Sequence, residues 1–306
     1  MNQFLLIQEN LFCFLLIKTT MNFNAINRVC NKEFSSLSGK LHSFFRKNGF
    51  TEAYYQNHLD ILSACENPKS IGTFQHYGDK FPLRQTNQMG LEYAMLQNPA
   101  DYYCFTTSYR MEQDINKGRH NTIFPMCEFE IQKGTLDELI DFEKELIRSL
   151  GYKGKFEEMD YEDVCKKLDI DEIEDFEEDF LCKQYAPVIF LKKFPEKTDP
   201  FFNMERDEHF LANKVDVLML GKNTLGEVRG METIGSAVRS CDVEQMRQSF
   251  KTSVGGEYHK TLYEKFGKER VDKELEEYFA MPMIPRSGAG IGFNRMLNFV
   301  RLHDLI

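Results

Sequence analysis

Apolar and polar residues alternate in two ways along this chain, and each pattern predicts a different kind of element. Between residues 34 and 49, apolar side chains recur every three or four positions, serines precede them, and Gly49 follows the last one. This pattern predicts a helix with one apolar face. A second helix is expected from the capping box T-L-D-E, which starts at Thr135, to Gly151.

Runs of alternating or continuous apolar residues between turn signals predict strands at 102–109, 123–131, 187–194, 215–220 and 230–238. Helical spacing returns at 243–250, 258–266 and 270–278. Strands joined by loops, with helices before and after them, predict an α+β fold in which helices flank an antiparallel sheet.

The 306 residues contain no internal repeat and no linker rich in proline or glycine. We therefore expect one domain over 34–306, with an acidic insertion at about 152–185, and an N-terminal extension over 1–33. The longer apolar cluster of that extension is too short to span a bilayer, and no cleavage site follows it. We expect a dispensable extension without membrane association, and Met21 is an alternative start of translation.

Composition narrows the functional classes. The formal net charge is −10 and the pI is near 5.3, which disfavours a protein that binds nucleic acid by charge alone. The eight cysteines form no C-x-x-C pair, so structural zinc and a disulfide framework are not expected. A reducing cytoplasm fits this cysteine pattern best.

The segment after the first expected strand carries cationic and aromatic residues. Arg110 and Glu112 lie two residues apart and would share one face, so they could bind a phosphate and an amine or form an ordinary ion pair. Arg119 and His120 lie on a basic turn that could reach a terminal phosphate. Phe124, just beyond that turn, offers a flat face to a purine.

On the strand expected next, Glu128 and Glu130 would point to one side, and Cys127, Phe129 and Ile131 to the other. A buried carboxylate without a partner is costly. We therefore expect the acidic side to meet a cationic group of a ligand, a metal or an arginine.

Two carboxylates on neighbouring expected strands, Asp216 and Glu232, suit Mg²⁺ that bridges the phosphates of ATP, because magnesium takes few protein oxygens. Arg239 stands seven residues after Glu232 and could bind a carboxylate or an amide of a substrate. Glu227 is the rival metal ligand, but Ile234 stands seven residues after it, where an arginine is needed.

The string G-A-G-I-G-F-N-R (288–295) predicts a closely packed strand-to-helix turn. Such a turn could bring Arg295 to the face of an adenine opposite Phe124, where cation–π stacking is favourable. A glycine-rich turn without any ligand is the alternative.

Taken in order, these segments resemble the catalytic domain of class II aminoacyl-tRNA synthetases of the asparaginyl and aspartyl branch. The resemblance runs from about Phe34 to Leu305, with 104–131 similar to motif 2 and 285–297 similar to motif 3. Three further strings support the resemblance. L-S-A-C-E (62–66) resembles a segment of the family near motif 1, whereas Q-T-N-Q-M-G-L-E (85–92) and V-I-F-L-K-K-F-P (188–195) resemble signatures of the asparaginyl branch.

The resemblance implies ATP, Mg²⁺ and an amino acid, aspartate or asparagine, as ligands. The implied ATP-binding residues are Arg110 at the α-phosphate and substrate carboxylate, Arg119 and His120 at the γ-phosphate, and Glu112, Phe124 and Arg295 around adenine. The implied metal ligands are Glu232 and, in an assisting role, Asp216. The implied substrate-binding residues are Glu66, Gln88 and Glu128 at the α-ammonium group and Arg239 at the side chain.

The sequence also departs from the family pattern. A motif 1 proline is missing, which leaves open the geometry of the homodimer that the resemblance implies. Arg286 stands where the asparaginyl branch has histidine, and Leu91 where the aspartyl branch has lysine. Ile123 and Asn294 each stand where the family has glutamate. Leu91 and Arg286 fit neither aspartate nor asparagine specificity cleanly.

Fewer than forty residues precede the expected core, where synthetases of this branch carry an anticodon-binding barrel. We therefore expect a stand-alone asparagine synthetase, which activates the β-carboxylate of aspartate with ATP and releases asparagine when ammonia attacks the activated group. An aminoacyl-tRNA ligase is an alternative that the acidic charge disfavours, and a degenerate core that serves as a binding or regulatory module is another. Catalysis would consist mainly of positioning and charge neutralisation.

Overall fold

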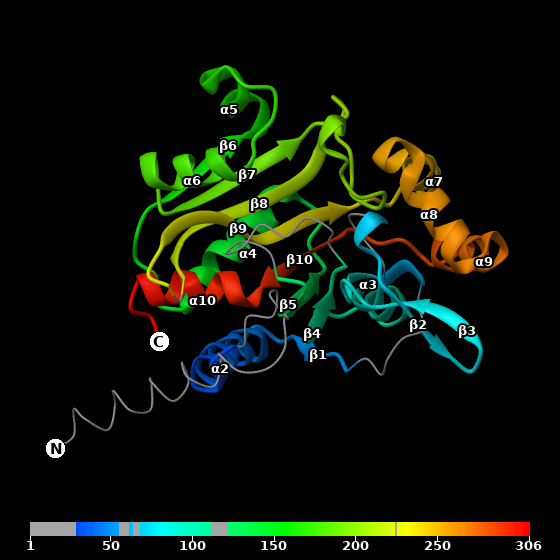
Figure 1. Cartoon of the computed structure of the whole chain (residues 1–306), viewed down its shortest axis with the longest axis horizontal. Helices are drawn as coiled ribbons and strands as arrows, with labels where there is room; N and C mark the ends of the chain where they lie inside the picture. Colours follow the sequence, from blue (N-terminus) through cyan, green and yellow to red (C-terminus); the bar gives the residue numbers. More distant parts are fainter. Residues whose placement is uncertain (1–28, 55–60, 64–67, 112–120, 224) are drawn as a thin grey trace.

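An eight-stranded sheet organises the chain, whose computed structural model describes residues 29–54, 61–63, 68–111, 121–223 and 225–306 (Figure 1). In spatial order the strands are β1 (Thr51–Glu52), β4 (Tyr102–Tyr109), β5 (Ile123–Ile131), β10 (Arg286–Gly292), β9 (Val228–Arg239), β8 (Ala212–Lys222), β7 (Val188–Phe194) and β6 (Phe156–Asp160). Neighbours from β4 to β7 are antiparallel, whereas β1 and β6 add parallel edges. A separate hairpin pairs β2 (Thr73–His76) with β3 (Asp79–Pro82).

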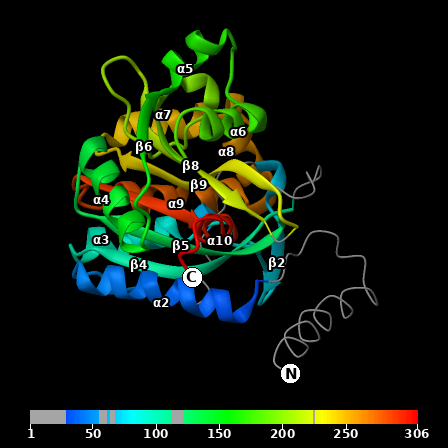
Figure 2. The same ribbon diagram turned by 90° about the vertical axis from the view of Figure 1, so that its left-hand side faces the viewer.

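One face of the sheet is covered by α2 (Asn31–Lys47), α4 (Leu136–Ser149) and α10 (Phe293–Leu302). Figure 2 shows α2 running along the β4 side of the molecule. Leu41 and Phe45 of α2 share a core with Phe129 of β5, Val217 of β8 and Phe299 of α10. Burial of these apolar side chains is the main driving force that fixes the helices on the sheet.

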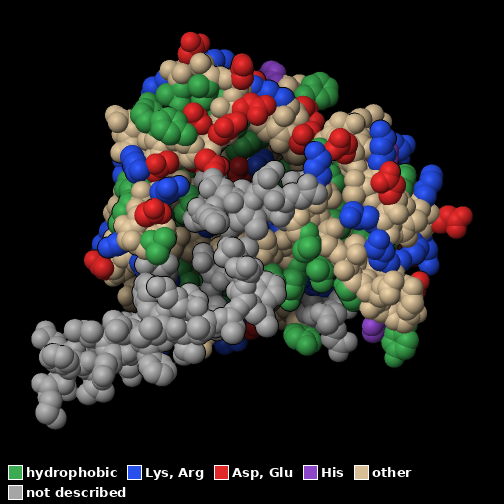
Figure 3. Space-filling model, in the orientation of Figure 1, with side chains coloured by type: hydrophobic (Ala, Val, Ile, Leu, Met, Phe, Trp, Pro, Cys, Tyr) green, Lys and Arg blue, Asp and Glu red, His purple; other side chains and the backbone are tan. Residues whose placement is uncertain are grey.

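A second core lies at the end of the sheet where α7 (Val243–Thr252), α8 (Glu257–Phe266) and α9 (Lys268–Phe279) gather beside α3 (Gln88–Gln97), as Figure 1 shows. The acidic stretch forms β6, α5 (Tyr161–Leu168) and α6 (Asp175–Gln184), which pack on β7 and β8 through a third apolar cluster. Figure 3 shows acidic side chains on the surface of this part of the molecule. Short 3₁₀ helices occur at η1 (Ile61–Ser63), η2 (Pro68–Ser70), η3 (Glu196–Thr198) and η4 (Ser253–Gly256).

The expected elements are confirmed, two of them residue for residue at β4 and β5. Thr135 caps α4 as expected, because its side chain accepts the Glu138 amide at 3.3 Å. The glycine-rich string 288–295 is mainly the buried strand β10 rather than a turn, and the helix begins at Phe293. The domain boundaries stay a prediction. Among the described residues, no helix is long and apolar enough to cross a membrane.

Candidate active site

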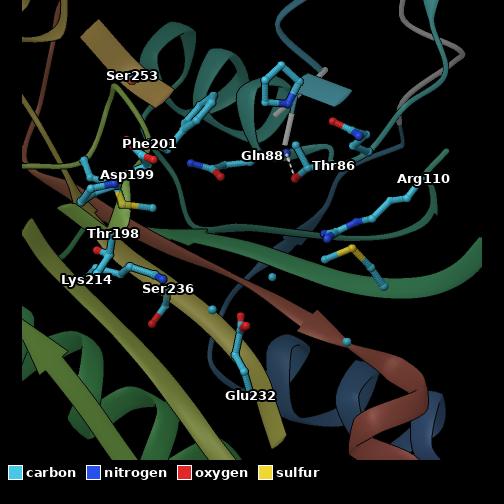
Figure 4. Close-up of a pocket in the computed structure, with 18 of the residues that line it drawn as sticks. Thr86, Gln88, Arg110, Thr198, Asp199, Phe201, Lys214, Glu232, Ser236 and Ser253 are labelled. Carbon is cyan, nitrogen blue, oxygen red and sulfur yellow. Dashed lines mark hydrogen bonds between the residues drawn. The ribbon is translucent and has the colours of Figure 1, made fainter. Parts of the chain in front are cut away.

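A cavity of about 660 Å³ opens over the sheet between the end of β4, the β8–β9–β10 strands and the start of α3 (Figure 4). Six of the expected site residues line it: Gln88, Arg110, Phe124, Glu232, Arg239 and Arg295. Glu128 and Asp216 lie immediately behind lining residues, as their contacts below show. Glu66, Glu112, Arg119 and His120 lie outside the described residues.

Arg110 and Phe124 form one wall of the cavity. Arg110 directly follows β4, and its backbone amide donates to the Thr122 carbonyl at 2.7 Å, which holds it against the start of β5. Its guanidinium carbon lies 5.4 Å from the centroid of the Phe124 ring. Phe124 therefore already meets a cation on one ring face in this structure. Such a wall fits a flat base joined to an anionic group.

Arg295 reaches the same cavity from the first turn of α10. Its Nη1 donates to the Glu232 carbonyl at 2.6 Å, and the same nitrogen lies 3.8 Å from Glu232 Oε2. The side chain is 28% exposed, so the cation remains accessible to a ligand. Arg295 thus links the motif on α10 to the carboxylate on β9.

Two carboxylates converge over Gly235. A side chain at this glycine would touch Glu232 Oε1, and Asp216 Oδ1 lies near the same point, so the glycine leaves room for both. Lys214 Nζ donates to Asp216 Oδ2 at 2.8 Å. Burial raises the pKa of Asp216 to about 7, a shift that Lys214 opposes and Glu232 reinforces. Figure 4 shows Arg110, from the segment after β4, and Glu232, from β9, pointing toward the cavity.

The carboxylate pair fits a magnesium ion. Asp216 Oδ1 is buried and meets no hydrogen-bond partner within the described part of the chain, so it has a free lone pair for a cation. That part holds no group of three or more His, Cys, Asp or Glu residues that could bind a metal ion by themselves. Magnesium suits such a site, because it commonly binds one or two carboxylates together with water and substrate phosphates.

Behind Arg239 lies a buried network of two arginines and two glutamates. Arg239 binds Glu130 through Nε–Oε1 at 2.7 Å and Nη2–Oε2 at 3.1 Å. Arg286 binds Glu92 Oε2 through Nε at 3.0 Å and Nη2 at 2.7 Å, and Tyr278 donates to the same oxygen at 2.7 Å. The expected arginine partner of the acidic face of β5 is confirmed for Glu130.

The pKa values of the two buried glutamates shift in opposite directions. Burial raises the pKa of Glu130 to about 7, although Arg239 opposes this shift. Burial also acts on Glu92, but the guanidinium groups of Arg286 and Arg239 outweigh it and hold the pKa of Glu92 below its usual value. Glu92 is therefore ionised at neutral pH.

Glu92 also orients a lining residue. Gln88 stands one helical turn before Glu92 on α3, and its Nε2 donates to Glu92 Oε1 at 3.2 Å. With the amide nitrogen fixed in this way, the carbonyl oxygen of Gln88 is the atom left to accept a hydrogen bond from a ligand. Glu128 supports the start of the same helix, because the Asn87 amide donates to its two oxygens at 3.0 and 2.9 Å and the Thr86 hydroxyl binds it as well.

Sequence reasoning missed two residues of this site, Glu92 and Lys214. The spacing of both residues in the sequence could have indicated them. Glu92 follows Gln88 by four residues on a helix, and Lys214 precedes Asp216 by two residues on a strand, so each shares a face with an expected site residue. Asn294 also lines the cavity, and its side-chain nitrogen and oxygen are buried without a hydrogen-bond partner among the described residues.

Solved structures share this fold. Asparaginyl-tRNA synthetase from Pyrococcus horikoshii in complex with asparaginyl-adenylate matches with a TM-score of 0.70 and 19% identity over 88% of this chain and 64% of that chain. The Entamoeba histolytica asparaginyl-tRNA synthetase complex with asparaginyl-adenylate matches with a TM-score of 0.68 and 18% identity over 89% of this chain and 64% of that chain. A putative aspartyl-tRNA synthetase from Leishmania major Friedlin matches with a TM-score of 0.66 and 14% identity over 90% of this chain and 63% of that chain.

This chain therefore spans less than two thirds of the length of these structures. No curated protein matches its sequence significantly. The family model "tRNA synthetases class II (D, K and N)" matches residues 31–306, which include every described element. On this match, the chain belongs to the class II tRNA synthetase (D, K and N) family, a family of ATP-dependent ligases.

Proposed function

We propose that this protein is an ATP- and Mg²⁺-dependent adenylate-forming ligase that makes asparagine from aspartate and ammonia. The observation that carries the proposal is that one cavity joins three functional groups. These are the Arg110–Phe124 wall, the carboxylates around Gly235 and the Gln88–Arg239 end. Such a cavity suits a nucleotide at the first wall, its phosphates near the carboxylates and a small amino acid at the far end.

In the first step, a β-carboxylate oxygen of aspartate attacks the α-phosphorus of ATP, the bond to the β-phosphate bridging oxygen breaks, and pyrophosphate leaves. Arg110 and Arg295 would stabilise the negative charge that develops on the phosphates. Asp216 and Glu232 would hold Mg²⁺, which when bound neutralises phosphate charge and orients the leaving group.

In the second step, ammonia attacks the acyl carbon of the β-aspartyl-adenylate, the bond to the AMP oxygen breaks, and the nitrogen loses a proton. Gln88 would accept a hydrogen bond from the substrate ammonium group through its carbonyl oxygen, and Arg239 would contact the side chain of the substrate. No protein nucleophile is required, because the adenylate is already an activated acyl donor. Positioning of the two reactants then supplies most of the rate enhancement.

The choice of ammonia as acceptor is supported by charge. With a net charge of −10, and with acidic side chains gathered over β6, α5 and α6, the chain is poorly suited to hold tRNA by phosphate contacts. The alternative is an aminoacyl-tRNA ligase for asparagine. One observation favours it. Arg239 is already paired with Glu130, so the pair as a whole is nearly neutral and suits the amide side chain of asparagine.

The test is a reaction of the purified protein with ATP, Mg²⁺, aspartate and ammonium. Amino-acid analysis should detect asparagine, and nucleotide analysis should find AMP and pyrophosphate in equal amounts. Arg110→Ala, purified in parallel, controls for contaminating host enzymes and should produce no asparagine. Charging of tRNA with asparagine, combined with no asparagine synthesis, would replace this proposal with the aminoacyl-tRNA ligase.

A further inference from the structure

Lys214 is a cation of the cavity that the function proposed above leaves without a role. It stands on β8, two residues before Asp216, and its side chain lines the cavity with 23% exposure. Figure 4 shows it beside Ser236. Its ammonium group binds Asp216, one of the two carboxylates that suit a metal.

Two contacts hold this ammonium group in place. Lys214 Nζ lies 2.8 Å from Asp216 Oδ2 and 4.1 Å from the centroid of the Phe194 ring, which is itself buried. The pair occupies one oxygen of Asp216, while Oδ1 of the same carboxylate points to the side shared with Glu232 Oε1 over Gly235. A fixed positive charge thus lies directly beside the Asp216–Glu232 carboxylate pair.

We propose that Lys214 contacts the polyphosphate of ATP and supplies, beside Asp216, a built-in positive charge in a position that would otherwise need a divalent cation. An ammonium group donates up to three hydrogen bonds, so Lys214 can bind Asp216 and a phosphate oxygen together. Lys214 then satisfies Oδ2 of Asp216, and the exchangeable metal belongs on the opposite side, between Oδ1 of Asp216 and Glu232. This inference rests on the proposed binding of ATP in the cavity.

Calorimetric titration of the full-length protein with ATP, without an amino acid, tests the inference apart from turnover. The titration is run in EDTA and over a series of Mg²⁺ concentrations. Lys214→Met should weaken ATP binding about tenfold to a hundredfold in EDTA, the range expected for one charged hydrogen bond. It should also raise the Mg²⁺ concentration needed for half-maximal ATP affinity, because a metal must replace the lost charge.

Lys192→Met is the matched control. Lys192 lies on the neighbouring strand β7, has the same side-chain exposure of 23%, and binds Glu158 at 2.9 Å rather than a residue of the cavity. Its loss should leave ATP binding unchanged in both conditions. Lys214→Arg should retain most of the wild-type affinity, because the charge is preserved. Circular dichroism spectra check that every variant is folded.

A double variant separates a phosphate contact from simple neutralisation of Asp216. If Lys214→Met combined with Asp216→Asn bound ATP as tightly as the wild type, Lys214 would only screen Asp216 and the inference would be overturned. Equal affinities of Lys214→Met and Lys192→Met in EDTA and in Mg²⁺ would overturn it as well. Failure of the wild type to bind ATP in any condition would instead reject the proposed function itself, and the inference with it.

Discussion

Arg239 and Glu130 form a two-point ion pair deep in the sheet, with 2.7 Å between Nε and Oε1 and 3.1 Å between Nη2 and Oε2. Glu130 lies opposite Gly288 on β10, and Arg239 lies on β9, the other neighbour of β10. The pair therefore reaches across the central strand at a glycine. A side chain at Gly288 would overlap the Glu130 carboxylate and crowd the Phe129 carbonyl.

Replacement of Gly288 by alanine should consequently destabilise the protein. We expect a loss of about 1–3 kcal/mol in the free energy of unfolding, because the added methyl group meets backbone and a fixed ion pair. Urea denaturation measures it. Gly290→Ala on the same strand is the control, since its methyl group would meet only the flexible end of Met126. Equal losses in the two variants would contradict the proposed crowding.

Arg286→Met should be among the most destabilising single substitutions in this chain. Arg286 and Glu92 are both fully buried, and removal of the guanidinium leaves an ionised carboxylate without its main partner. Breaking a buried pair in this way typically costs about 3–5 kcal/mol. Arg247→Met, which removes an exposed pair with Glu276, should cost less than about 1 kcal/mol in the same urea titration. A small loss for Arg286→Met would show that Glu92 is compensated elsewhere.

Arg110→Ala and Arg295→Ala should abolish turnover while the protein stays folded. Each removes a cation from the cavity in which we place ATP, and ATP affinity should fall about tenfold to a hundredfold. Calorimetric titration with ATP and a turnover assay provide the measurements. Arg301→Ala is the control. Arg301 lies on α10 like Arg295, but it binds Glu33 outside the cavity. Wild-type affinity and rate in both cavity variants would contradict the ATP-binding roles of these arginines, whereas ATP binding without turnover in the wild type itself would favour a binding module.

Glu232→Gln should lose the Mg²⁺ dependence of ATP–pyrophosphate exchange, and Asp216 should not compensate. Glu232 lines the cavity, whereas Glu227 lies in the β8–β9 turn and binds the Asn223 side chain at 2.9 Å. Glu227→Gln should therefore behave as wild type across a Mg²⁺ titration of the exchange rate. The reverse result would move the metal to Glu227 and remove the substrate-binding role assigned to Arg239.

Glu143 should make the stability of the fold fall as pH rises. Burial raises its pKa to about 8 from 4.5, and neither carboxylate oxygen has a hydrogen-bond partner among the described residues. The folded protein keeps this proton up to about pH 8, whereas the unfolded chain releases it above 4.5. The contribution of Glu143 to the free energy of unfolding is therefore complete below pH 4.5. It is lost between pH 4.5 and 8, at up to about 1.4 kcal/mol per pH unit.

Glu143→Gln should remove this part of the pH dependence. Unfolding free energies from urea titrations between pH 5 and 8 should therefore decline more steeply for the wild type than for the variant. Glu145→Gln, an exposed position on the same helix, should retain the wild-type slope. Parallel curves for the wild type and Glu143→Gln would mean that Glu143 is ionised in the folded protein.

The sequence by itself determined the long elements and most of the site. Strands β4 and β5 begin and end where alternation and turn residues predicted, and the capping box placed the start of α4. These features depend on local spacing, which a linear reading captures directly. Local patterns nominated five of the lining residues, Arg110, Phe124, Glu232, Arg239 and Arg295, whereas only the resemblance to class II synthetases implied a role for Gln88.

Only the tertiary structure decided which of these residues are partners. Glu130 and Arg239 are 109 residues apart, and Glu92 and Arg286 are 194 residues apart. Both pairs depend on β10, the last strand in the chain, entering between β5 and β9 in one particular register. A shift by one residue would turn every side chain of that strand to the other face. Register is set by packing of the whole sheet, so no local pattern could reveal it.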